Sequence, residues 1–394
     1  MTAPDIFLVA AARTAIGTFG GTLKDVPMTT LATTVVREAM QRAGIAPDAV
    51  GHVVMGNVIP TEPRDAYLSR VAAIEAGIPQ ETPAFNVNRL CGSGLQAVLL
   101  AAQALKAGDA EVAVGGGAES MSRGPYLLPA ARWGARMGDA PLLDYMLGIL
   151  HDPFHGIHMG ITAENVAAEH GIGREMQDAL ALTSQQRAAR AIAEGRFASQ
   201  IVAVEVPSRK GPQRFEVDEH VRGDVTPEQL AKMKPAFKKD GSVTAGNASG
   251  LNDGAAAVVL ATGEAVRRHG LKPLARLVSH GHAGLDPKLM GLGPVPATRI
   301  ALQRAGLKVS DLDVVEANEA FAAQACAVSK LLDLDPAKVN PNGSGISLGH
   351  PVGATGAIIT TKALYELQRT GGRYALVTMC IGGGQGIAAI LERC

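Results

Sequence analysis

One cysteine of this chain stands where a reactive thiol would be expected. Cys91 lies in NRLCGSGLQAV, residues 88–98, directly before an apolar stretch with helical spacing. The N–H groups at a helix N-terminus carry partial positive charge, which lowers the pKa of a thiol and favours the nucleophilic thiolate. Gly92 and Gly94 would let a bound group approach those N–H donors. We predict that Cys91 is a nucleophile, and the alternative is a small cysteine of the core.

Two further residues extend this chemistry. His350 stands in SLGHPVGATG, and Cys380 ends an apolar run in TMCIGGGQG. Pro351 suits the first turn of a helix, so we expect His350 at or just before a helix start, as a base or as a structural histidine. A thiol at a strand end, followed by three glycines, is accessible, which makes Cys380 a second candidate. Cys326 lies in an apolar helical run and is expected in the core, and Cys394 is the last residue.

Several polar residues leave both a chemical and a structural reading open. Asn318 and Glu319 follow an apolar run in VVEANEAFA, where an Asn either caps a helix or takes part in chemistry. Ser249, in TAGNASGLNDG, suits a turn. His158 and Met159, in HDPFHGIHMG, suit an apolar substrate channel or simple packing. The histidines there lack the spacing of a metal site, so no metal is expected.

The elements that must position these residues repeat within the chain. Residues 41–57 and 303–318 both read as a helix end with QRAG, a loop, a short strand and a closing Asn. CGSGLQAVLLAAQAL matches HPVGATGAIITTKAL, which puts Cys91 and His350 at equivalent helix starts. EVAVGGG at 111–117 parallels ALVTMCIGGG at 375–384. Such repeats indicate duplication, and two packed repeats would bring Cys91 and His350 into one pocket.

Alternation of strand and helix in each repeat predicts an α/β protein with a mostly parallel sheet covered on both faces. The expected halves are residues 1–120 plus 250–273, and residues 274–394. The segment 121–249 is richer in charge, Pro and Met, and we expect it to be an inserted loop domain with substrate or oligomer contacts.

Composition narrows the class of protein. Hydrophobic residues make up 47% of 394, aromatics 4%, and there are 46 glycines, which predicts a core of small aliphatic side chains with close backbone approaches. A formal charge of zero gives no support to nucleic acid or anionic membrane as a partner. We see no segment of transmembrane length and no signal peptide. Four dispersed cysteines without CxxC, and a C-terminal LERC, favour the cytoplasm.

Taken together, the motifs resemble the thiolase family over nearly the whole chain, from near residue 13 to the end. The matching segments stand in thiolase order: NRLCGSGLQAV, GGGAESMSR, HMGITAENVA, TAGNASGLNDGAA, EANEAFAAQ, NPNGSGISLGHPVGATG and TMCIGGGQG. WGARMGD, LHDPFHGIHMG and MCIGGGQGIAAI look most like bacterial β-ketothiolases of polyhydroxyalkanoate synthesis, of the broad-chain-length type. The resemblance implies a duplicated α/β/α/β/α fold with an inserted loop domain.

The resemblance also implies a reaction, the reversible Claisen condensation of acetyl-CoA with an acyl-CoA by ping-pong catalysis. Cys91 would carry the acyl group, His350 would accept its proton, and Cys380 would take a proton from acetyl-CoA. One oxyanion hole would use His350 and a water held by Asn318, and the other the N–H groups of Cys91 and Gly382. Coenzyme A thioesters would be substrates, with no tightly bound cofactor.

By the same resemblance, residues of the insertion and its surroundings would contact coenzyme A, with Arg222 at the nucleotide end. The other implied contacts are Leu150, His158, Met159, Phe237, Ala245, Ser249 and Phe321. Thiolases are typically homotetramers, dimers of dimers held together by the insertion. Three rivals stay open: a degradative 3-ketoacyl-CoA thiolase, a non-catalytic acyl-CoA or lipid carrier, and a decarboxylating ketosynthase. The second thiol at Cys380 argues against the ketosynthase.

Overall fold

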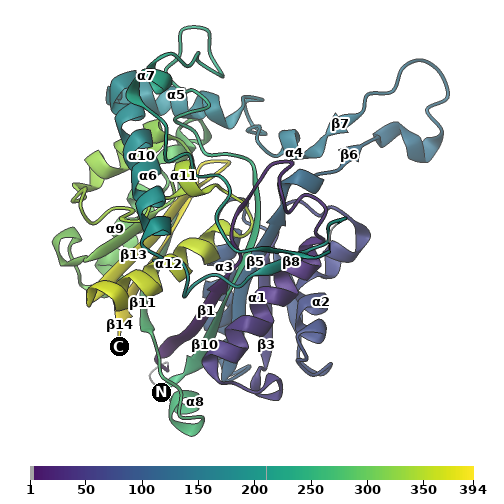
Figure 1. The fold of residues 1–394 in the computed structure, drawn as a ribbon, viewed down its shortest axis with the longest axis vertical. Coiled ribbons are helices and arrows are strands. Elements are labelled where there is room, and N and C mark those ends of the chain that lie inside the picture. The colour runs from purple at the N-terminus through teal and green to yellow at the C-terminus, as the bar shows by residue number, and fades with distance from the viewer. Residues whose placement is uncertain (1–3, 210) are drawn as a thin grey trace.

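The computed structural model describes residues 4–209 and 211–394, and one large sheet forms its centre (Figure 1). The strands on its main path are β1 Ile6–Arg13, β3 His52–Gly56, β4 Ala84–Val87, β5 Val112–Ser120, β10 Asn252–Thr262, β11 Ala275–Gly284, β12 Val314–Ala317, β13 Tyr374–Ile381 and β14 Gln385–Arg393. Their order is β12-β13-β14-β11-β1-β10-β5-β3-β4, and short β2 (Gly17–Thr18) pairs with β10. Strands of the two predicted halves therefore occupy opposite ends of the sheet.

The sheet is mixed, so the prediction of a mostly parallel sheet is wrong. In the described part of the chain only β3–β4, β3–β5 and β12–β13 are parallel, and the other pairs run antiparallel. The reason is local at β13 and β14, which are joined by only three residues, 382–384. Gly383 and Gly384 have φ of +79° and +77°, which reverses the chain tightly and forces antiparallel pairing.

The helices that cover this sheet form three further layers, in agreement with the predicted duplication. They are α1 Met28–Ala43, α2 Leu68–Glu75, α3 Ser93–Ala107, α9 Pro294–Ala305, α10 Ala322–Leu332 and α12 Thr355–Thr370. On the outside, α1 packs on β1 and β10, and α9 packs on β11 and β14. Between the halves, α3 contacts β3 and β5, and α12 contacts β10 and β13. The order of layers is thus α/β/α/β/α, in which each half of the sheet forms one β layer.

The central helices are apolar because strands cover them on both sides. The 18-residue segment Leu90–Ala107 is long and apolar enough to cross a membrane by length and composition, and 61% of it is buried inside the fold. The expectation that no segment reaches such length is therefore wrong. Its apolar character reflects its place between the two halves of the sheet.

The two central helices also touch through their backbones. A Cβ on Gly94 would lie 2.7 Å from the Ala357 nitrogen, and one on Gly356 would lie 2.2 Å from the Leu95 nitrogen. Gly92 is also closely packed, since its Cβ would lie 2.5 Å from Cδ1 at the end of the Ile381 side chain. These glycines allow close contact within the protein, and the prediction that Gly92 and Gly94 also let a bound group approach N–H donors stays a prediction.

The sequence repeat is confirmed in one segment and wrong in another. α1 and α9 both end at a glycine with left-handed φ, Gly44 at 65° and Gly306 at 67°, and a loop then leads to β3 or β12. The glycine runs are not equivalent. Residues 115–117 lie inside β5, where a Cβ on Gly115 would meet Val98 Cα at 2.6 Å, whereas 382–384 form the β13–β14 turn.

Residues 121–249 contribute helices and a projecting arm. The helices are α4 Tyr145–Gly148, α5 Met159–His170, α6 Arg174–Ala193 and α7 Pro227–Ala231, and the short strands are β6 Tyr126–Leu127, β7 Leu143–Asp144, β8 Val204–Val206 and β9 Gln213–Phe215. Figure 1 shows the β6–β7 arm extending away from the body. Trp133 and Met137 at its tip are 80% and 97% exposed. The remaining helices are α8 Gly263–Arg268 and α11 Gly345–Leu348.

Candidate active site

A cavity of about 380 Å³ lies where both halves of the sheet and the segment 121–249 meet. Cys91, His350, Cys380 and Gly382 all line it. Cys91 precedes α3, His350 lies between α11 and α12, and Cys380 stands near the end of β13. The structure therefore brings the two thiols and the imidazole predicted from the sequence into one pocket.

Most of the residues predicted to contact coenzyme A line the same cavity. These are Leu150, His158, Met159, Phe237, Ala245, Ser249 and Phe321. Arg222 is not part of this lining, and its backbone N–H donates to Gln185 Oε1 at 2.7 Å. The role of Arg222 at the nucleotide end stays a prediction.

No sequence pattern marks the apolar residues that complete the lining. They are Val58, Leu90, Met121, Leu147, Ile149, Leu251, Met290 and Val352, with smaller residues between them. Nothing separates these side chains from ordinary core residues until the fold gathers them. Leu90 is distinctive in the structure, because its φ of 48° is rare for a residue other than glycine. The resulting cavity is mostly apolar, and it suits an acyl chain better than a charged substrate.

Cys91 differs from the prediction in its protonation. Burial raises its pKa to about 11, the backbone N–H groups of Gly382 and of Cys91 itself lower it, and the charge of Glu119 raises it further. The expected lowering by a helix N-terminus is therefore outweighed, because the half-buried sulfur packs in an apolar cluster with Met121 and Val352. At neutral pH Cys91 is a thiol, and it needs a base to become a nucleophile.

His350 lies in a loop, which corrects the expectation that Pro351 belongs to the first turn of a helix. The helix α12 begins only at Thr355. Thr355 Oγ1 donates its proton to the Pro351 carbonyl at 2.9 Å, so it accepts from His350 Nδ1 at 2.7 Å. Nδ1 therefore carries the proton, and Nε2 keeps a free lone pair. Burial lowers the pKa of His350 to about 4, which keeps the ring neutral and able to act as a base.

Asn318 stands beside this lone pair. Its Nδ2 is 3.5 Å from His350 Nε2, and its Oδ1 has no hydrogen-bond partner among the described residues. The alternative of a helix cap is wrong, because α10 begins at Ala322 with Phe321 at the N-cap position. Although Asn318 is outside the cavity lining, it contacts a residue that belongs to it.

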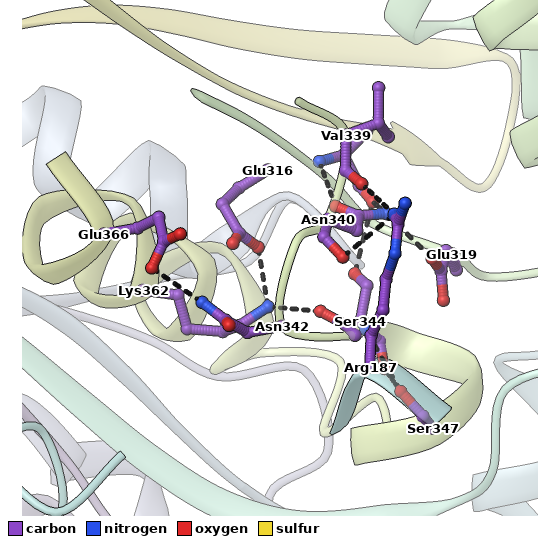
Figure 2. Close-up of polar contacts among 12 residues, drawn as sticks. Arg187, Glu316, Glu319, Val339, Asn340, Asn342, Ser344, Ser347, Lys362 and Glu366 are labelled. Atoms are coloured by element: carbon purple, nitrogen blue, oxygen red, sulfur yellow. Dashed lines mark hydrogen bonds and ion pairs between the residues drawn. The ribbon is translucent and has the colours of Figure 1, made fainter. Parts of the chain in front are cut away.

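Glu319 and Asn340 belong to a buried polar network (Figure 2), and Glu319 directly follows Asn318 in the chain. Asn340 Nδ2 donates to the Ala317 carbonyl and to Glu319 Oε1, both at 2.8 Å. Ser184 Oγ donates to the other oxygen of Glu319 at 2.6 Å. Glu319, a polar candidate of the sequence, thus has a structural role next to Asn318. Asn340 and Ser184 could not be singled out from the sequence.

Cys380 is fully buried on the other side of the cavity, so the expectation of an accessible thiol is wrong, although the residue lines the cavity. Its apolar neighbours include Met159, Met290 and Phe321. Burial raises the pKa of the Cys380 thiol strongly, and the charge of Cys91, which lines the same cavity, raises it further. Cys326, on α10, is half-buried and outside the cavity lining.

An aromatic wall borders the cavity on the side of the segment 121–249. The His158 ring stacks on Phe237, with centroids 4.6 Å apart, and Phe237 meets Phe321 edge to face at 6.1 Å. His158 Nδ1 also accepts from the Gly160 N–H, which caps α5 and fixes the ring. The wall is therefore rigid, and it joins the insertion to the second half.

Comparison with known proteins decides the family. The thiolase N-terminal domain family matches residues 6–264, and the thiolase C-terminal domain family matches residues 271–393. This chain belongs to the thiolase family. The resemblance seen in the motifs is thereby confirmed over nearly the whole chain.

Individual thiolases are similar along their full length. The chain is 68% identical to "Beta-ketothiolase BktB" of Cupriavidus necator, over 99% of both chains. It is 52% identical to an "Acetyl-CoA acetyltransferase" of Chromobacterium violaceum, over 99% of this chain and 100% of that protein. The crystal structure of human mitochondrial 3-ketoacyl-CoA thiolase in complex with CoA has a TM-score of 0.97 and 47% identity, covering 99% of this chain and 98% of that one. The thiolase fold expected from the sequence is therefore confirmed.

Proposed function

We propose that this thiolase is a β-ketothiolase that condenses acetyl-CoA with a second acyl-CoA to a 3-ketoacyl-CoA and free CoA, and that also catalyses the reverse thiolysis. The observation that carries the proposal is one apolar cavity lined by Cys91, Cys380 and His350, with the Gly382 backbone beside them. The names of the similar proteins support an acyltransferase of this kind. CoA thioesters serve as substrates, and no tightly bound cofactor is needed.

In the first half-reaction, the Cys91 sulfur attacks the acyl-CoA carbonyl while His350 Nε2 takes the thiol proton. Because the pKa of Cys91 is about 11 and that of His350 about 4, full proton transfer before attack is unfavourable. Proton transfer and C–S bond formation therefore proceed together. The CoA thiolate leaves and takes the proton back from the imidazolium, so His350 ends neutral. The N–H groups of Cys91 and Gly382 stabilise the oxyanion formed on the way.

In the second half-reaction, Cys380 acts as the base. Cys380 first gives its own proton to His350 Nε2, and its raised pKa makes the resulting thiolate a strong base toward the acetyl-CoA methyl group. The resulting carbanion attacks the acyl-Cys91 carbonyl, and the new C–C bond forms as the C–S bond to Cys91 breaks. The leaving Cys91 thiolate takes the proton from the His350 imidazolium, and Cys380 keeps the methyl proton as a thiol. While His350 holds the proton from Cys380, its Nε2–H and the neighbouring Asn318 stabilise the enolate oxygen of acetyl-CoA, in line with the 3.5 Å between Asn318 Nδ2 and His350 Nε2.

The covalent step is tested by mass spectrometry of the intact protein after mixing with acetyl-CoA. We expect the mass to rise by one acetyl group, located on the Cys91 peptide. Cys91→Ala should abolish the label, and Cys326→Ala, which changes a thiol outside the cavity, should retain it. A protein that only carries acyl-CoA would show no covalent label at all.

We also propose a broad acyl-chain range and a role in supplying polyhydroxyalkanoate synthesis. The identity of 68% with the protein named beta-ketothiolase and the apolar cavity support this. Thiolysis rates on acetoacetyl-CoA and on five- and six-carbon 3-ketoacyl-CoA substrates test the range. Comparable rates on the longer substrates agree with it, and activity on acetoacetyl-CoA alone contradicts it. The rival degradative role draws on the likeness to the human 3-ketoacyl-CoA thiolase and predicts a preference for still longer chains.

For the assembly, we propose a homotetramer whose contacts come from the arm. Exposed apolar side chains on it support this: Tyr126, Leu127, Leu128, Trp133, Met137, Leu142 and Leu143. Such a patch is unfavourable in water unless a partner covers it. Trp133→Ser with Met137→Ser should give dimers in sedimentation analysis, while Tyr67→Ser outside the arm should leave the tetramer intact.

For the location, we propose the cytoplasm, supported by the four free cysteines and testable by cell fractionation.

A further inference from the structure

A buried carboxylate outside the proposed chemistry lies next to the cavity. Glu119, on β5, is fully buried and accepts four hydrogen bonds. Asn57 Nδ2 and the Ile59 N–H donate to Oε1 at 2.8 and 3.1 Å. The N–H groups of Val58 and Gly353 donate to Oε2 at 3.1 and 2.8 Å. One side chain thus connects two separate segments of backbone.

These segments are the two walls of the active-site pocket. Residues 57–59 follow β3 in the first half, and Val58 lines the cavity. Gly353 belongs to the loop of the second half that carries His350, and its neighbour Val352 also lines the cavity. A Cβ on Gly353 would lie 2.5 Å from Glu119 Oε2, so the loop is drawn tightly onto the carboxylate. A carboxylate of the first half therefore fixes the histidine loop of the second.

Glu119 is one of three fixed points of this loop. Asn252 Oδ1 accepts from the His350 N–H at 2.9 Å, and Thr355 accepts from the ring. Asn252 sets the backbone position and Thr355 sets the ring orientation. Glu119 holds the far side of the loop, three residues after His350, and it is ionisable, whereas Asn252 and Thr355 are neutral.

The hydrogen bonds of Glu119 favour its charged form. All four partners donate, so both carboxylate oxygens are satisfied as acceptors and an added proton would displace a donor. Burial raises the pKa of Glu119 to about 8, opposed by the N–H groups of Ile59, Val58 and Gly353. In mildly alkaline solution the group is therefore an anion. That anion acts on Cys91 and raises the pKa of the thiol.

We propose that Glu119 is a positioning residue of the thiolase reaction, which holds the loop of His350 opposite Cys91 through the Gly353 N–H. The inference rests on the proposed β-ketothiolase function. Glu119 is not part of the cavity lining, so it acts through the loop of His350.

Glu119→Gln tests the proposal. The amide keeps the shape of the side chain but removes the charge, and its NH₂ group faces N–H groups that need an acceptor. We expect kcat for thiolysis to fall about 10- to 100-fold with KM changed less than about twofold, because misplacement of a catalytic group slows the chemistry. We also expect the apparent pKa of Cys91, from the pH dependence of iodoacetamide labelling of its peptide, to fall. A purely structural glutamate would leave that pKa unchanged.

Glu366→Gln is the matched control. Glu366 is also buried and bonded, to Asn342 at 2.8 Å and to Arg369, but it lies near the far end of α12 (Figure 2). Its substitution should leave kcat and the pKa of Cys91 unchanged. Asn57→Ala is the milder variant, for use if Glu119→Gln does not fold. It removes one donor and keeps the charge, so kcat should fall about three- to tenfold without a fall in the pKa of Cys91.

The outcomes separate the two proposals. A wild-type protein without thiolysis or acyl labelling overturns the proposed function itself. If the wild type is active, two results would overturn the role of Glu119. These are a full kcat in Glu119→Gln, or a pKa of Cys91 that does not fall in that variant. Should Glu119→Gln fail to fold, an unchanged kcat in Asn57→Ala overturns the inference.

Discussion

Asn57 and Glu119 in the first half occupy the same strand positions as Asn318 and Cys380 in the second. Asn57 directly follows the last paired residue of β3, and Asn318 directly follows that of β12. Glu119 on β5 pairs with Gly254 on β10, and Cys380 on β13 pairs with Gly386 on β14. The two pairs are therefore related by the internal duplication.

The two halves use these positions differently. In the first half, Asn57 donates to Glu119, and both side chains hold backbone in place. In the second half, Asn318 faces His350, and Cys380 lines the cavity. Duplication thus gives two equivalent pairs of residues at the strand ends. The pair in the first half supports the backbone, and the pair in the second half lies at the cavity and its histidine. The support acts across the boundary, because Glu119 holds the loop of His350.

The largest expected effect comes from Cys380→Ser. A serine hydroxyl is a far weaker acid than a thiol and cannot supply a comparable base, so condensation should slow by up to about 10⁴-fold. Labelling of Cys91 by acetyl-CoA should remain largely intact, because that step uses His350. The measurement is the acylation and condensation rates of the same preparation. If labelling is lost as well, the division of labour between the two thiols is wrong.

The next largest effect is expected when each of the two asparagines is changed to alanine, because the loss of kcat should differ between the halves. Asn318→Ala removes a donor beside His350 and should lower kcat by about 10²- to 10³-fold. Asn57→Ala removes a supporting hydrogen bond and should cost only about three- to tenfold. Steady-state thiolysis by both variants measures the difference. Equal losses would show that the halves share the chemistry in a way the structure does not predict.

The sequence predicted the chemistry because reactive residue types are rare in this chain and each stands in a distinctive short motif. Cys91 and His350 could be paired through the internal repeat of the sequence, and Cys380 was a separate candidate that the resemblance to thiolases joined to them. The helix–loop–strand echo after QRAG placed Asn57 and Asn318 correctly as counterparts. The repeated pattern predicted helices on both faces of a sheet, and the α/β/α/β/α order of layers came from the resemblance to thiolases.

The parts that failed depend on distances that a linear pattern does not contain. Aligning the glycine runs hid the equivalence of Glu119 and Cys380, because a strand glycine and a turn glycine look alike in sequence. The pKa of Cys91 was misjudged, because burial by Met121 and Val352 outweighs the helix N-terminus. The four donors of Glu119 come from residues 57–59 and 353, and only the fold brings them together.

Stability should depend on pH in opposite directions in the two halves. Burial lowers the pKa of His350 from 6.5 to about 4, so its contribution to stability is present above pH 6.5 and is lost as the pH falls through 4, by about 3 kcal/mol. Burial raises the pKa of Glu119 from 4.5 to about 8, so its contribution is present below pH 4.5 and is lost as the pH rises through 8.

Chemical denaturation across this pH range tests both signs. His350→Asn should flatten the acid side of the profile, and Glu119→Gln should flatten the alkaline side. Wild-type curves that keep both slopes in both variants would assign the pH dependence to other groups.

The smallest effects are expected where the halves are alike, in the central helix layer. Gly94→Ala and Gly356→Ala both place a Cβ against backbone of the other helix, at 2.7 and 2.2 Å. The crowding costs about 1–3 kcal/mol, and the better helix propensity of Ala returns about 1 kcal/mol. Both variants should therefore lose a little stability in thermal unfolding, Gly356→Ala more than Gly94→Ala because its contact is shorter. A stabilised variant in either half would mean that the helices can move apart at no cost, and that their contact does not fix the distance between Cys91 and His350.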